Sequence, residues 1–124
     1  MVNAKQIYNS LLSDSRITSL IPEDNILNAY PSSIETYPCI IFLDENQVDT
    51  EYGDDMPKAS DCSVTIHIFS KKIDDYPSTS TIAIAIAEVM NEKLWHGAGN
   101  GEVPDPDVDV EHRVMNFNTS IYNN

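Results

Sequence analysis

The sequence has few of the residues that mark several common classes of protein. It contains seven basic residues against 20 acidic ones, which gives a formal net charge of −13. Nucleic-acid-binding domains neutralise phosphates with a basic stripe, whereas here the basic residues are scattered apart from the pair Lys71 and Lys72. An anionic membrane would repel the same charge. The composition therefore argues against ordinary nucleic-acid binding and against a role at a membrane surface.

Long apolar runs and paired cysteine motifs are missing as well. No run approaches the ~20 residues that cross a bilayer, and the N-terminus starts as a polar helix without a signal-peptide core. We therefore expect the protein to be made and kept in the cytoplasm. Cys39 and Cys62 lie in or beside apolar segments and form no Cys-x-x-Cys motif, so we interpret them as small buried hydrophobic residues.

What the sequence does contain is a compact series of apolar patterns in 124 residues, the length of one domain. The patterns predict helix at 4–12 and 16–21, strand at 25–30, 37–43 and 64–70, helix at 80–95, and a last strand at 113–122. Apolar and polar side chains alternate in 64–70 and 113–122, so one sheet face is expected to pack on helices while the other meets water. We also expect the polar-faced last strand to offer an exposed edge to a neighbouring subunit.

The segment 80–95 could be mistaken for a strand, because Thr81 to Ala87 alternates. Alanine favours helix over strand, and the apolar residues further along continue at helical spacing. We therefore predict a helix that is capped by Ser78 or Ser80 and ends near His96 and Gly97.

Two acidic segments connect these elements. The segment 44–61 either extends two hairpin strands outward or forms a mobile loop, and 97–109, with three glycines and two prolines, is predicted to be a flexible loop. We describe the chain as a single domain, 1–124, with flexible acidic loops near 44–61 and 97–109.

Three constellations suggest chemistry at first sight. The series Asp105, Asp107, Asp109 and Glu111 resembles a calcium loop but lacks the glycine at the sixth position and the glutamate at the twelfth. The glycines of 97–101 follow a predicted helix instead of preceding one, so a phosphate cradle is not expected.

The three histidines, His67, His96 and His112, are far apart in sequence and form no metal motif. No nucleophile motif is present either, and the many carboxylates single out no acid–base pair. We predict no catalytic site, no metal site and no cofactor.

The order of these patterns resembles one bacteriophage family. The residues that carry the resemblance are Asp14, Leu20 and Ile21 after the opening helix, the segment 37–42 (Tyr-Pro-Cys-Ile-Ile-Phe), the strand 64–70, the helix 82–95 and the start of the last strand, 113–117. Over nearly the whole chain, the sequence resembles the tail completion or tail-to-head joining proteins of long-tailed phages and prophages, which are similar in fold to tail terminators. The acidity of 44–61 departs from that pattern.

The resemblance implies an α+β fold, with an antiparallel or mixed sheet of about four strands and two main helices on one face. It also implies a structural protein, not an enzyme, that caps the tail tube as a ring. The expected ring is a hexamer on assembly, and the isolated protein is expected to be a monomer. The implied partners are the tail tube protein and the head connector or closure protein. DNA passes through the lumen without sequence-specific binding, and the protein is found in the host bacterial cytoplasm during assembly and then in the virion tail or neck.

We expect the two acidic segments to supply lumen or partner surfaces. The candidate residues are Asp44, Glu45, Asp49, Glu51, Asp54, Asp55, Glu102, Asp105, Asp107 and Asp109. Other functions remain open on the sequence alone. They are a head-closure or other minor tail or neck protein, a small-molecule-binding domain, and a DNA-mimic inhibitor, which would need acids spaced regularly along one surface.

Overall fold

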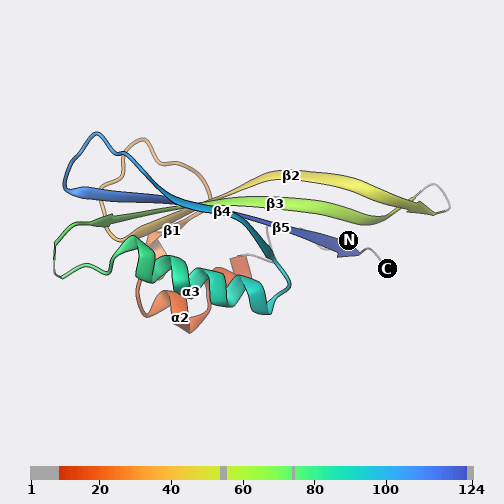
Figure 1. The fold of residues 1–124 in the computed structure, drawn as a ribbon, viewed down its shortest axis with the longest axis horizontal. Coiled ribbons are helices and arrows are strands. Elements are labelled where there is room, and N and C mark those ends of the chain that lie inside the picture. Colours follow the sequence, from red (N-terminus) through yellow and green to blue (C-terminus); the bar gives the residue numbers. More distant parts are fainter. Residues whose placement is uncertain (1–8, 54–55, 74, 123–124) are drawn as a thin grey trace.

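The protein folds around one long, twisted sheet with helices on one side (Figure 1). The computed structural model describes residues 9–53, 56–73 and 75–122, with the backbone alone for 44–60, 121 and 122. The strands are β1 (Ile26–Leu27), β2 (Cys39–Gly53), β3 (Met56–Lys71), β4 (His96–Val103) and β5 (Val110–Tyr122). The helices are α2 (Ser15–Thr18) and α3 (Thr79–Glu92), with a 3₁₀ turn at Glu23–Asn25 and a further helical stretch at 9–12.

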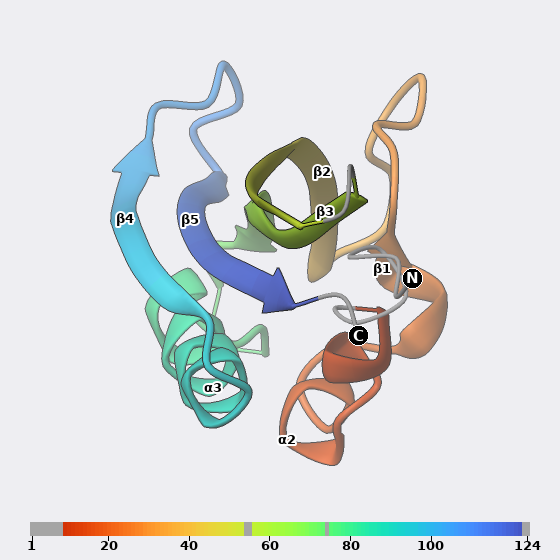
Figure 2. The ribbon, with the colours of Figure 1, turned by 90° about the vertical axis from the view of Figure 1, so that its right-hand side faces the viewer.

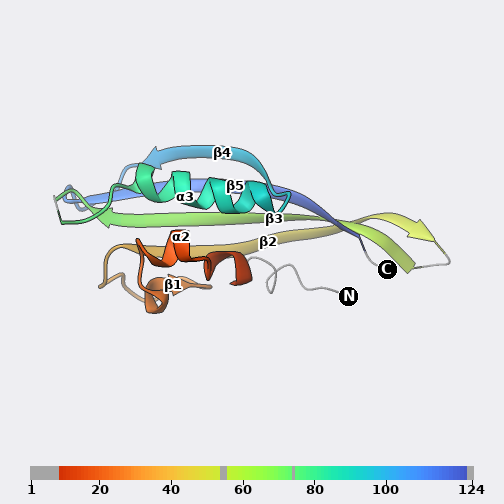
Figure 3. The same cartoon turned by 90° about the horizontal axis from the view of Figure 1, so that it is seen from below.

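The strand order is β1-β2-β3-β5-β4, so β3 lies at the centre. The pairs β2–β3, β3–β5 and β4–β5 are antiparallel, and the short β1 pairs parallel with Ile40 and Ile41 of β2. This makes a mixed five-stranded sheet with one main helix, α3, and short helices packed against it. The predicted α+β class is thus confirmed. Figure 3 shows α3 and α2 on the same face of the sheet.

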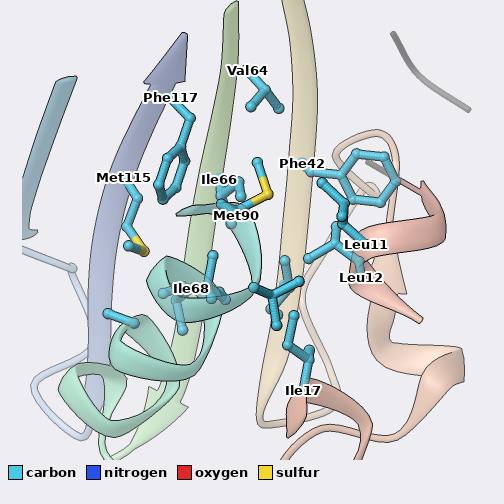
Figure 4. Close-up of a cluster of buried hydrophobic side chains, with 14 of the residues drawn as sticks. Leu11, Leu12, Ile17, Phe42, Val64, Ile66, Ile68, Met90, Met115 and Phe117 are labelled. Atoms are coloured by element: carbon cyan, nitrogen blue, oxygen red, sulfur yellow. The ribbon is translucent and has the colours of Figure 1, made fainter. Parts of the chain in front are cut away.

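The main core lies between that face and the helices (Figure 4). From β3 it takes Val64, Ile66 and Ile68, each at most 1% exposed, as the alternation in 64–70 predicts. Met115 and Phe117 of β5 enter it from the neighbouring strand. Since the same face of three strands is apolar, the helices bury their own apolar stripe against it.

The opposite face carries a second, smaller cluster at one end of the sheet. Cys39, Ile41, Phe69 and Val110 are buried there, with residues of the 27–37 segment packed over them. Phe69 lies on the polar side of the alternation in 64–70 and is buried in this cluster. Both cysteines are buried and free, as predicted, and burial raises the pKa of the Cys39 thiol to about 11.

Helix α3 begins where the sequence predicts and ends earlier. The Ser78 hydroxyl accepts a hydrogen bond from the Thr81 N–H at 3.2 Å, which is an N-cap. At the other end, Trp95 N–H bonds to the Met90 carbonyl and Leu94 N–H to that of Asn91, the pattern of a Schellman motif. Leu94 has φ 67°, the left-handed conformation that this motif needs.

The predicted helix end near His96 and Gly97 is therefore wrong by several residues. Trp95 is 1% exposed and belongs to the main core with Met90, so burial of the indole stops the helix and turns the chain back toward the sheet. No glycine marks this end, and the stop could not be recognised from composition.

The predicted loop at 97–109 is wrong over its first part, because His96–Val103 forms β4. Pairing with β5 supplies the backbone hydrogen bonds and overrides the weak strand preference of the three glycines. β4 also takes the sheet edge that was predicted for the last strand. Instead, β5 lies between β3 and β4 through residues 112–118.

The segment 44–61 is strand on both sides of 54–55. Of the two predicted alternatives, the extended hairpin is therefore confirmed and the mobile loop is wrong. Together with the end of β5, the hairpin extends beyond the helical layer (Figure 1). We call this three-stranded extension, residues 48–53, 56–61 and 120–122, the arm. The predicted strand at 25–30 shortens to Ile26–Leu27, and of the predicted helix 4–12 only residues 9–12 fall within the described chain, where they are helical.

Two isoleucines of α3 provide a matched test of the core. Ile86 is fully buried, whereas Ile84, two residues away, is 62% exposed. We expect Ile86→Ala to lower the free energy of unfolding by about 2–5 kcal/mol, because it leaves a cavity beneath the sheet. Ile84→Ala is the control and should change it by less than about 0.5 kcal/mol. Urea denaturation measures both free energies. Similar losses in the two variants would show that α3 is rotated about its axis relative to this structure.

Leu94 provides a second test, since its left-handed backbone is costly for any residue with a Cβ. That conformation costs about 1–2 kcal/mol in an L-residue, and glycine loses about 0.5–1 kcal/mol more chain entropy. Leu94→Gly should therefore stabilise the protein by about 0.5–1 kcal/mol, as the leucine is 74% exposed and little burial is lost. Leu94→Ala, which keeps the Cβ, should be close to neutral. A glycine variant no more stable than the alanine variant would argue against the conformation.

Candidate assembly surfaces

The structure places the two acidic segments at opposite ends of the sheet. Val103 of β4 shares a row of the sheet with Cys39 of β2, so the β4–β5 turn lies at the end where β2 begins. The β2–β3 hairpin turns at the other end, after Gly53. Figure 1 shows the far ends of β2 and β3 at one tip of the molecule and the β4–β5 turn toward the other. The candidate residues therefore do not form one site within a copy of the chain.

At the hairpin end, Asp44, Glu45, Asp49 and Glu51 belong to β2. The structure gives their backbone positions along β2, with Asp44 and Glu45 beside the packed body and Asp49 and Glu51 in the arm. Asp54 and Asp55 lie outside the described residues. For this end, the structure gives the course of the strands, and the sequence shows that the segment is strongly acidic.

At the other end, the aspartates of the β4–β5 turn bond to their own backbone. A carboxylate oxygen of Asp105 accepts from the Asp107 N–H, and one of Asp107 accepts from the Asp109 N–H, each at 2.9 Å. These successive Asx turns give the segment 104–109 a defined shape. They also explain the spacing that resembles a calcium loop. Each carboxylate accepts a hydrogen bond from the N–H two residues further on, so aspartates recur at every second position.

This turn is also attached to the end of β3. The Lys72 N–H donates to the Asp109 carbonyl at 2.9 Å, and the Lys71 ammonium lies 4.0 Å from the Asp107 carboxylate. The same ammonium lies 4.5 Å from the centre of the Tyr37 ring. The one basic pair of the sequence thus anchors the acidic turn. Nearby in β4, Glu102 lies 3.4 Å from the Arg113 guanidinium across the strands.

Two of the three histidines meet on the face away from α3. His67 Nδ1 lies 3.0 Å from His112 Nε2, a hydrogen-bonding distance. The Phe69 ring stacks on His112 with centroids 4.2 Å apart, and Tyr30 meets His67 edge-on. His96 lies elsewhere, at the start of β4. Within the ranges that the structure describes, no three His, Cys, Asp or Glu side chains come together as metal ligands.

The sequence held a signal for this pair. His67 falls on the polar positions of the alternation in 64–70, and His112 has the same parity as Asn116 and Asn118, polar positions of the last strand. The sequence does not give the register between the two strands, which decides whether the histidines meet. The structure supplies it by pairing Phe69 with His112, which leaves His67 diagonal to His112.

A shallow groove runs between α3 and β4 and was not predicted. Its volume is about 440 Å³. The residues that line it are Ala87, Asn91, Gly97, Ala98, Gly99, Asn100, Met115 and Phe117, and none of these side chains is charged. In a protein of charge −13, this surface stands out because it is neutral.

The histidine pair predicts a pH dependence. Burial lowers the pKa of His112, against the opposing pull of the Asp105 carboxylate. A lowered pKa means that the folded state binds fewer protons than the unfolded state, so this group's contribution is present above the unfolded pKa and is lost as the pH falls through the folded one. Between pH 7.5 and 5.5, the wild type should lose more stability than His112→Gln. Urea denaturation at the two pH values measures the free energy of unfolding of each protein. An equal loss in the wild type and in His112→Gln would contradict this prediction.

One comparison with known proteins identifies a family. The model of the tail completion protein gp17 family matches residues 5–122. No curated protein matches the chain at a significant level. Among the described residues, none of the helices has the length and apolar character to span a bilayer. The match covers every residue from which the resemblance was argued, and it confirms that prediction. The chain belongs to the tail completion protein gp17 family of bacteriophages, whose members are structural proteins of tail assembly and not enzymes.

Proposed function

We propose that this protein caps the phage tail tube as a ring and joins the finished tail to the head, leaving a channel for DNA. The observation that carries this proposal is the separation of the acidic segments to the two ends of one long sheet. A ring of such modules presents two different end surfaces. One can bind the tail tube protein and the other the head connector or closure protein.

The charge supports the channel. Six copies at −13 each give a hexamer of −78. Acidic residues on the lumen repel the phosphate backbone, so that DNA passes without being held. The candidates are the ten acidic residues of the two segments. The hairpin group is the stronger, because the Asp105 and Asp107 carboxylates of the β4–β5 turn already accept hydrogen bonds from their own backbone.

The same charge opposes ring closure. Copies repel one another at low ionic strength, and the isolated protein is then monomeric until the tail tube gathers it. Assembly takes place in the host cytoplasm, and the ring remains in the virion neck.

A head-closure or other neck role is the second candidate, since it uses the same two-ended module. The partner distinguishes the two roles. A tail-capping protein binds the tail tube protein, whereas a head-closure protein binds the portal complex.

Light scattering at several salt concentrations tests the proposal. Raising the ionic strength from 0.01 M to 0.15 M shortens the Debye length from about 30 Å to about 8 Å. We expect a hexamer-sized species to increase over this range, and with tail tube protein present we expect rings at the tube ends in electron micrographs. A monomer that ignores salt, concentration and tubes, and that instead binds the portal complex, would select the second candidate.

A further inference from the structure

The outer edge of β4 is open in the described chain. β4 pairs with β5 on one side and ends the sheet on the other. Open edges are usually protected by lysine or other charges, proline, bulges or short length. His96–Val103 spans eight residues without a lysine, arginine or proline, and its protection is limited to Glu102 and one bulge between Gly97 and Gly99. Figure 2 shows β4 on the outer side of the sheet, next to α3 and away from β1.

The glycines of β4 are not required by its backbone. None of Gly97, Gly99 and Gly101 has a positive φ. A Cβ on Gly101 would meet nothing within 4 Å, and one on Gly97 would make an ordinary contact of 4.0 Å with Phe117. Glycine weakens a strand, and its presence there often marks a bulge or the close approach of another backbone. β4 has a bulge between Gly97 and Gly99, whereas no bulge lies at Gly101. The bare stretch 97–101 fits such an approach.

The neutral groove lies directly beside this edge. Met115 and Phe117 form part of its lining, and Ala87 and Asn91 line it from α3. Ile84, which is 62% exposed, precedes these two residues at helical spacing and thus extends the same face of the helix. An extended strand added to β4 would place alternate side chains over this apolar surface.

A second copy of the chain offers a complementary edge. β1 pairs with Ile40 and Ile41 of β2, and no other strand of the described residues pairs with that side of β2. The rest of this edge contains register shifts after Asp44, Asp49 and Glu51. That edge is acidic, whereas 96–101 contains no acid. Two copies can therefore pair β4 with β2 while keeping their acidic segments apart, which a contact between two β2 edges does not allow.

The register favours a ring over a filament. His96 to Gly99 of β4 lie in the same rows of the sheet as Leu43 to Asn46 of β2. These two four-residue stretches of open edge thus lie at one level, and a neighbour can pair them without a shift along the strands. Residues 100–103 lie level with the start of β2, where β1 pairs with Ile40 and Ile41. A contact between two different surfaces closes into a ring when each step is a rotation without a large translation.

We propose that the outer edge of β4, with the groove beside it, binds the outer edge of β2 (residues 43–53) of the next copy, and that this contact closes the ring. The inference rests on the proposed ring-forming function and names the surface that carries it. The partner is a second copy of this chain, bound head to tail.

A pair of asparagine variants tests the surface. The Asn100 side-chain oxygen accepts from the Arg113 guanidinium at 3.0 Å, and Asn100→Asp keeps that acceptor while adding a negative charge beside the groove. Asn118→Asp adds the same charge on the opposite face of β5 and is the control. We expect Asn100→Asp to need about tenfold more protein to form rings, a difference that shrinks at high salt, and Asn118→Asp to behave as the wild type.

Hydrogen exchange in the wild type then identifies the paired strands. The amides of 96–103 and of 43–53 should both become more protected in the ring than in the monomer. Rings whose 96–103 amides exchange as in the monomer, or equal assembly by the two variants, would overturn this inference and leave the ring-forming function intact. Protection of 96–103 without 43–53, or a species that stops at a dimer, would overturn the pairing with β2. A wild type that forms no ring even with tail tubes would refute the proposed function, and this inference with it.

Discussion

The alternation of side chains along β3 is the constraint on which the rest of the structure depends. Val64, Ile66 and Ile68 set one face of the central strand, and both neighbouring strands adopt the same parity through the register. A slip of one residue in either pair would expose a full row of apolar side chains. The alternation also ends within the strand, because 58–61 (Lys-Ala-Ser-Asp) is polar. One continuous strand therefore belongs first to the arm and then to the packed body.

The apolar core and the acidic residues occupy different parts of the sheet along its length. The apolar faces lie in the body beneath α3, and the acids concentrate toward the tips, where the hairpin and the β4–β5 turn lie. Only a few ion pairs in the described chain relieve this charge. Arg16 joins Asp14 before α2 to Glu92 at the end of α3, and it lowers the pKa of both carboxyl groups through its hydrogen bonds. Such exposed pairs orient the helices more than they stabilise them, so most of the repulsion stays available to act between copies.

The sequence was sufficient where local pattern and tertiary role agree. The parity of 64–70 and 113–122, the Ser78 cap and the buried cysteines were all predictable, because each depends on neighbours in the chain or on apolar character alone. The errors share one cause. β4 consists of residues that disfavour strands and exists only because β5 is beside it, and α3 stops because Trp95 is buried in a core that no local window contains. The histidine pair needed the register in addition to parity, and the groove needed the packing of α3 against β4.

The missed strand is also the one with the clearest consequence for assembly. A glycine-rich edge adds little to the stability of a single copy, since it buries no side chain and costs chain entropy. All eight of its residues are exposed in the isolated chain. Because residues 97, 99 and 101 are glycines, no side chain has to move aside when another strand pairs with this edge. A locally weak element is thus consistent with a protein whose lateral surface is completed by its neighbour. The acidic tips then limit that association until a tail tube brings the copies together.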